Sequence, residues 1–148
     1  METARETFYD FEHAIELLEE AQSEEDFRVL WVASITLCRA IGHMLKNSKD
    51  ERVRAASRKL FQEWKTEKDD IFFTFIKSER DAVLKNYSFS VDEGAGLAPI
   101  AVRDFVFEND WLYVPFADGS YDGMDARDKL VEARDWWVEQ LTRVEDMI

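Results

Sequence analysis

The sequence predicts a mainly α protein, an up-and-down bundle of about five helices with a β-hairpin inserted before the last helix. Two observations predict this class. Apolar residues recur every three or four positions through most of the chain, which is the period of an amphipathic helix. Both prolines and most of the glycines lie between residues 94 and 123, where the pattern changes to a period of two. The chain of 148 residues is expected to form one domain, residues 1–148.

The first two helices are expected at residues 3–21 and 24–46. The apolar stripe of the first consists of Phe8, Phe11, Ile15 and Leu18. Ser23 indicates the start of the second, because its hydroxyl can cap the helix while the carboxylate of Asp26 favours the positive N-terminal end. The apolar arc of the second helix is wide enough to contact more than one neighbour, so this helix is predicted to be central.

Two further helices are expected at residues 50–65 and 70–87. The third is the most basic segment of the chain, with an inner face of Val53, Ala56, Leu60, Phe61 and Trp64. The fourth begins with an aromatic run capped by Asp69 or Asp70 and continues as an amphipathic helix. The turns between these helices are short, which predicts antiparallel neighbours.

Residues 88–122 are predicted to form an insertion. Within it, residues 101–107 and 111–116 alternate with a period of two and carry valine and aromatic side chains, which predicts a β-hairpin. A lone hairpin is marginally stable, so it must pack on the bundle or on a partner. The final helix is expected to begin near Asp122 or Asp125 and to run almost to Ile148.

Composition limits the possible functions. The net charge of −13 repels nucleic-acid phosphate and anionic membranes, so a protein partner or a second copy of the chain is the expected partner. Cys38 excludes an internal disulfide and is expected to be a small buried side chain. The chain shows no signal-peptide pattern and no obvious membrane span, which predicts a cytoplasmic protein. No cofactor is expected.

Arg39, His43 and Arg80 are the candidate catalytic residues. Arg39 and His43 lie four positions apart and share a face at the edge of the buried stripe. Arg80 lies near the apolar stripe of its own helix, where a guanidinium needs a carboxylate or a ligand. Together they would form a polar island, with the histidine as acid or base and the arginines binding an anion. Alternatively, Arg39 pairs with a glutamate of a neighbouring helix and His43 is a satisfied boundary residue.

Two sets of aromatic residues are candidate binding residues. One set would line a pocket between helices, around the polar island: Trp31, Phe72 and Phe73. The other would lie exposed on the hairpin and bind a partner: Trp111, Tyr113 and Phe116. Aromatic side chains of this kind dominate the energetics of interfaces and pockets.

Residues 118–123 match the opening of a calcium-binding loop. Asp118, Ser120 and Asp122 place oxygens at alternate positions, and Gly123 occupies the sixth. The twelfth position, which needs a bidentate glutamate, is Lys129. A turn followed by a helix cap explains the same residues, so no metal is expected.

Two segments resemble known proteins. Residues 39–45 and 75–87 resemble segments of small bacterial helical bundles, and the second also resembles the HEPN class, which includes ribonuclease toxins and inactive relatives. That class carries an arginine, a polar residue, and a histidine about five positions after the arginine. Arg80 and Asp81 match the opening, but Lys85 stands where the histidine is expected. Arg39 and His43 also resemble this pair of residues, but they have one residue too few between them. The resemblance implies a bundle fold and a degenerate, non-catalytic member of the class.

Three functions follow from these patterns. The leading hypothesis is a non-enzymatic binding or accessory module that engages a protein partner or itself. The second is a HEPN-like ribonuclease or RNA-processing toxin component that uses Arg80, Arg39 and His43. The third is a small-molecule sensor with a pocket between helices, which a cavity of sufficient size would favour.

Overall fold

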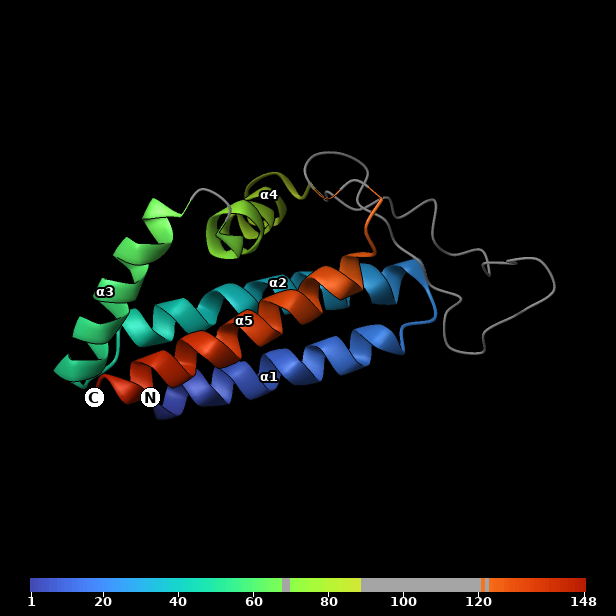
Figure 1. The fold of residues 1–148 in the computed structure, drawn as a ribbon. Helices are drawn as coiled ribbons and strands as arrows, with labels where there is room; N and C mark the ends of the chain where they lie inside the picture. The colour runs from blue at the N-terminus through green and yellow to red at the C-terminus, as the bar shows by residue number, and fades with distance from the viewer. Residues whose placement is uncertain (68–69, 89–120, 122) are drawn as a thin grey trace.

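The computed structural model describes residues 1–67, 70–88, 121 and 123–148 (Figure 1). Within these residues the chain is mainly helical, as predicted. Its five α-helices and one π-helix follow the order α1 (Glu2–Glu19), α2 (Glu24–Lys46), α3 (Glu51–Thr66), η1 (Phe72–Lys77), α4 (Ser78–Asn86) and α5 (Ala126–Asp146). The strands predicted at 101–107 and 111–116 lie outside the described residues.

Three helices begin at capping residues, of which the sequence indicates Ser23 and, as one of two alternatives, Asp125. The hydroxyl of Ser23 accepts a hydrogen bond from the N–H of Asp26 at 3.1 Å. The carboxylates of Asp50 and Asp125 accept from the N–H two residues further on, at 2.9 and 3.0 Å. A side-chain cap of this kind stabilises a helix by about 1 kcal/mol. The starts of α2, α3 and α5 are therefore set by local chemistry.

The helix α2 is central, as its wide apolar arc predicts. It contacts each of the other five helices of the described chain. Its fully buried residues include Trp31, Ile35, Cys38 and Ile41. Burial raises the pKa of the Cys38 thiol, so the side chain stays protonated and acts as a small apolar group.

The helices α1, α2 and α5 run side by side, with α2 opposite in direction to α1 (Figure 1). In contrast, α3 rises steeply away from them, and α4 is seen almost end-on. These segments cross the other helices and so depart from the predicted up-and-down order. The turn before α3 is held by Arg54, whose guanidinium donates to the carbonyls of Ser48 and Lys49 at 2.6 and 3.0 Å. A short turn makes two helices neighbours, whereas side-chain packing sets their crossing angle.

The predicted fourth helix begins with a π-helix, η1, before it continues as α4. The carboxylate of Asp70 accepts a hydrogen bond from the N–H of Phe72 at 2.8 Å, so Asp70 is the cap that the sequence suggests. A π-turn holds an extra residue and rotates the positions that follow it. Glu79, with 4% of its surface exposed, therefore enters the core, while Arg80 lies at its edge with 23% of its side chain exposed.

An aromatic cluster joins α3, η1 and α5, and it consists of Phe61, Trp64, Phe72, Phe73, Trp136 and Trp137. The ring centroid of Trp64 lies 4.9 Å from that of Phe72 and 4.8 Å from that of Trp136. Offset and edge-to-face contacts at such distances add about 0.5–1.5 kcal/mol per pair to the burial of the rings. The high aromatic content of the chain thus fixes α3 and η1 in their crossing positions.

The helix α2 also has the length and composition of a membrane span. Its 23 residues contain a window with a mean hydropathy of 1.2, and it is the one helix among the described residues that meets this criterion. The core helix of a soluble protein meets it as well. The cytoplasmic location therefore stays a prediction from the sequence.

Candidate functional site

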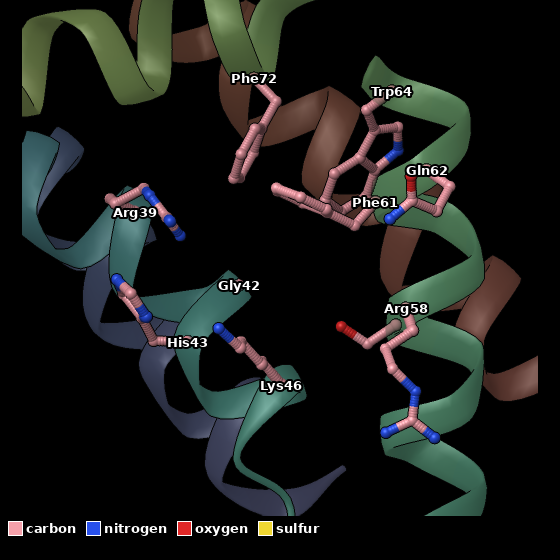
Figure 2. A pocket seen from close by; sticks show the side chains of 10 residues that line it. Arg39, Gly42, His43, Lys46, Arg58, Phe61, Gln62, Trp64 and Phe72 are labelled. Atoms are coloured by element: carbon pink, nitrogen blue, oxygen red, sulfur yellow. The ribbon is translucent and has the colours of Figure 1, made fainter. Parts of the chain in front are cut away.

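A pocket of about 410 Å³ lies between α2 and α3, with η1 at one end (Figure 2). We call it the α2–α3 pocket. Ten residues line it: Arg39, Gly42, His43 and Lys46 from α2, then Ser57, Arg58, Phe61, Gln62 and Trp64 from α3, and Phe72 from η1. Its size falls within the range of small-molecule sites, about 300–1,000 Å³.

The apolar wall of the pocket is part of the aromatic cluster. Phe61 meets Phe72 edge to face, with centroids 5.9 Å apart, and Trp64 packs against Phe72. The indole N–H of Trp64 donates to the side-chain oxygen of Gln140 at 3.1 Å, which fixes the ring. Because these rings are held by their neighbours, they form a preorganised apolar surface for a ligand.

The opposite wall of the pocket carries the nitrogen atoms of α2. Arg39, His43 and Lys46 lie along one face of the helix, three and four positions apart, and Figure 2 shows them on the side facing α3. The guanidinium carbon of Arg39 lies 4.8 Å from the centroid of the Phe72 ring, a cation–π contact. The Arg39 Nε is buried and has no hydrogen-bond partner among the described residues.

Positive charges cluster at and around this wall, and they lower the pKa values of Arg39 and His43. Burial, followed by the positive charge of Arg80, lowers the pKa of Arg39, and the carboxylate of Asp81 offsets part of this effect. Burial lowers the pKa of His43 as well, and the charges of Arg39, Arg80 and Lys46 lower it further. His43 is therefore neutral at pH 7, while the arginines stay charged.

Gly42 allows close packing on the α2 side of the pocket. A Cβ atom at this position would lie 3.2 Å from Nη1 of Arg39 and 3.3 Å from Cη2 of Trp137. Both distances are tighter than ordinary van der Waals contacts, so any side chain here must displace a neighbour. The glycine thus lets Arg39 and Trp137 pack closely against α2.

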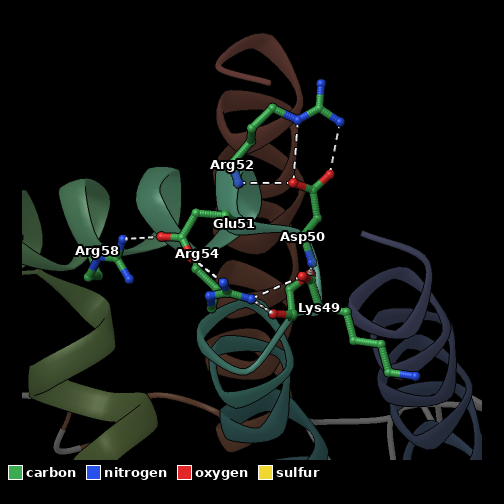
Figure 3. A network of polar contacts seen from close by, with 7 residues as sticks. Lys49, Asp50, Glu51, Arg52, Arg54 and Arg58 are labelled. Carbon is green, nitrogen blue, oxygen red and sulfur yellow. Dashed lines mark hydrogen bonds and ion pairs between the residues drawn. The ribbon is translucent and has the colours of Figure 1, made fainter.

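A polar network fixes the start of α3 and with it the position of Arg58 (Figure 3). Arg58 donates to Oε1 of Glu51 at 2.8 Å, and Arg54 pairs with the other oxygen of the same carboxylate. The hydrogen bond from Arg58 is the main cause that lowers the pKa of Glu51. The positive charge that α3 brings to the pocket is therefore balanced.

Arg80 does not line the pocket, although its charge reaches Arg39 and His43. Its Nη1 lies 3.0 Å from Oδ1 of Asp81. Lys77 and Lys85 approach the other oxygen of Asp81, at 3.0 and 3.7 Å. The three candidate catalytic residues therefore belong to one positively charged region, and only two of them reach the cavity.

The predicted aromatic lining is rearranged in the structure. Phe72 lines the pocket. Phe73 packs against Phe61, with centroids 5.6 Å apart, but lies outside the lining. Trp31 is fully buried in the core, and its indole N–H donates to Glu79 at 3.3 Å. The polar island and the pocket share Arg39 and His43, while Trp31 belongs to a separate buried hydrogen bond.

The remaining candidates lie outside the described residues: Trp111, Tyr113, Phe116, Asp118, Ser120 and Asp122. Lys129, at the twelfth position of the calcium-like loop, is buried; its Nζ donates to Glu132 and lies 4.1 Å from the centroid of the Tyr121 ring. No group of three or more His, Cys, Asp or Glu side chains in the described ranges could hold a metal ion.

Sequence reasoning missed the part of the site that α3 contributes. Phe61 and Trp64 are predicted as core, and the third helix is noted only as basic, so nothing in its spacing indicates that Phe61, Trp64 and Arg58 face Arg39. Gly42 was the available signal, because it is the one glycine inside a long predicted helix. An isolated glycine there indicates close packing or a functional cavity.

Comparisons of the chain with family models, with curated proteins and with solved structures returned no match.

Proposed function

We propose that this protein is a non-enzymatic binding module that holds a small organic molecule in the α2–α3 pocket. The observation that carries the proposal is the cavity of about 410 Å³ with an aromatic wall on one side and nitrogen donors on the other. Small-molecule sites combine a mainly apolar lining with a few polar groups that orient the ligand. It is closest to the third hypothesis from the sequence, a small-molecule sensor, although the lining includes α3 and only Phe72 of the three aromatic residues predicted to line the pocket.

The arrangement of His43 supports binding rather than turnover. A catalytic histidine is normally oriented by a second group that holds one ring nitrogen. Within the described residues, the His43 ring has no hydrogen-bonded partner of this kind, and no carboxylate or thiol lines the pocket. The lining is suited to orient a ligand and to neutralise its charge.

The proposal is tested by nuclear magnetic resonance with ¹⁵N-labelled protein and a library of small carboxylates, phosphates, amines and neutral aromatics. At least one compound is expected to shift the amide of Gly42 and the indole N–H of Trp64 saturably. The proposal is wrong if no compound does so, or if binding maps instead to the surface hollow of Arg52, Lys59 and Met147.

A pocket variant makes this test specific. Gly42→Ala places a methyl group close to Arg39 and Trp137, so the affinity of any compound found is expected to fall about tenfold, which corresponds to about 1.4 kcal/mol. Thr36→Ala is the control, because Thr36 is exposed on the same helix and lies outside the pocket lining. Equal affinity for Gly42→Ala and the unaltered protein would place the ligand elsewhere.

A second candidate function is the HEPN-like ribonuclease or RNA-processing component. One observation favours it: the charges of Arg39 and Arg80 both lower the pKa of His43, so two cations act on a histidine that could serve as an acid or base. The net charge of −13 opposes it, because most of the surface repels RNA.

A further inference from the structure

The charge of the α2–α3 pocket is unbalanced. Arg39, His43, Lys46 and Arg58 line it, and none of the ten lining residues is acidic. Arg58 is neutralised by Glu51, outside the lining. The lining of the cavity thus carries positive charge and no negative charge, in contrast to the net charge of −13 of the whole chain.

Arg39 is a partly buried pocket cation that forms no ion pair among the described residues. No ion pair joins its guanidinium to a carboxylate within the described ranges, and its buried Nε has no hydrogen bond there. Its guanidinium carbon lies over the ring of Phe72, and Arg39 lines the cavity. A buried cationic donor is costly unless it is paired, and an anionic ligand would supply the missing partner.

The carboxylate whose charge acts on Arg39, that of Asp81, is already paired with other cations. Asp81 raises the pKa of Arg39 by its charge, but Lys77, Arg80 and Lys85 already surround it at 3.0–3.7 Å. The hydrogen bond from Lys77 is the main cause that lowers the pKa of Asp81, as expected of a carboxylate with an excess of cations. Among the described residues, the region around Arg39 therefore carries a positive charge that no carboxylate pairs with directly.

We propose that the ligand of the α2–α3 pocket is an aryl anion, that is, a planar aromatic ring that carries a carboxylate or phosphate group. The ring would lie against Phe61, Trp64 and Phe72, and the anionic group would accept hydrogen bonds from Arg39 and Lys46. This inference rests on the proposed function, and it adds the chemical class of the ligand. Arginine is the preferred side chain for planar, two-point recognition of carboxylate and phosphate.

The test is a matched series of titrations, by calorimetry, with 1-naphthoate, 1-naphthyl phosphate and the neutral 1-naphthalenemethanol. At least one of the two anions is expected to bind at least tenfold more tightly than the alcohol. The anion that binds more tightly shows whether the pocket prefers a carboxylate or a phosphate group. If the alcohol binds as tightly as both anions, the pocket binds aromatic molecules but the anion inference is wrong. If none of the three binds while another class of compound occupies the pocket, the anion inference is wrong and the binding function stands.

Variants locate the anionic group. Arg39→Gln is expected to lose at least tenfold in affinity for the preferred anion and to leave that for the alcohol unchanged. Lys46→Gln, an exposed change that the fold tolerates, is expected to lose severalfold. Lys49→Gln is the control, because it removes the same charge from an exposed residue outside the lining. Equal losses in all three variants would show a general charge effect and overturn the inference.

Discussion

His43 is the pocket residue whose charge changes nearest to neutral pH. Burial and the charges of Arg39, Arg80 and Lys46 hold its pKa below the usual value of 6.5. A bound anion would raise that pKa, so binding takes up a proton. The affinity for an anion should therefore increase as pH falls below 7.

We expect 1-naphthoate to bind more tightly at pH 5.5 than at pH 7.5, by up to about tenfold for each unit by which the anion raises the pKa of His43. Titrations at the two pH values measure this ratio. His43→Gln should remove the dependence and keep the affinity measured at the higher pH. An unchanged pH dependence in that variant would assign the proton to another group.

The hydrogen bond between Trp31 and Glu79 gives a second prediction for single residues. Both side chains are buried, and the indole N–H donates to the carboxylate at 3.3 Å. Trp31→Phe removes the donor and leaves a cavity, so the free energy of unfolding should fall by about 1–3 kcal/mol. Glu79→Gln keeps an acceptor oxygen and should cost less. Urea unfolding of both variants tests whether Trp31→Phe destabilises the protein more than Glu79→Gln does. If Glu79→Gln is the more destabilising change, the hydrogen bond between Trp31 and Glu79 contributes little.

At the scale of elements, η1 determines which side of α4 faces the core. Deletion of Thr74, an exposed residue within η1, removes the extra residue, so an α-helical spacing would keep Glu79 in the core and Arg80 at its edge. If η1 kept its wider spacing after the deletion, Arg80 would take the place of Glu79 beside Trp31, and an unpaired buried charge costs about 3–5 kcal/mol.

The deletion is therefore expected to lower the free energy of unfolding by no more than about 1 kcal/mol beyond the control, measured by urea unfolding. Thr74→Ala is the control, since it keeps the length of η1 and removes only the hydrogen bonds of its hydroxyl with Tyr121 and Asp70. That change should cost about 1 kcal/mol. A loss of several kcal/mol in the deletion alone would mean that Arg80 has replaced Glu79 in the core, and it would contradict the prediction.

At the scale of the whole molecule, the net charge of −13 separates the small-ligand function from RNA binding. A polyanion must approach the entire acidic surface, whereas a small anion needs only the positive pocket. We expect no RNA cleavage and no RNA retention at about 150 mM salt, where charges are screened beyond about 8 Å. RNA that co-purifies and is lost in Arg39→Ala or Arg80→Ala would instead support the ribonuclease function.

The acidic surface and the aromatic residues predicted on the hairpin lead to one further prediction, that a protein partner or a second copy of the chain binds there. A tagged pull-down, read by mass spectrometry, should enrich one protein repeatedly and without nucleic acid. Trp111→Ala and Tyr113→Ala should reduce that recovery, while Tyr9→Ala, an exposed aromatic on α1, should not. Recovery that is unchanged by both hairpin variants would contradict the prediction.

The sequence by itself determined the helices and most of their ends. Apolar periodicity and the caps at Ser23, Asp50 and Asp125 are local properties, and the structure agrees with them. The central place of α2 also followed from its wide apolar arc. Local spacing did not reveal the π-turn, because hydrogen bonds to Asp70 and the packing of Phe72 and its neighbours outweigh the ordinary helical period.

Only the tertiary structure decided which residues share the pocket. Arg39 and His43 could be chosen from their spacing on one helix, but Phe61, Trp64 and Arg58 join them because α3 crosses α2 at a steep angle. That angle depends on how the aromatic cluster packs between three helices, which is a contact between distant parts of the chain. The periodicity of a helix specifies which face is buried, and its crossing partner specifies where a cavity remains.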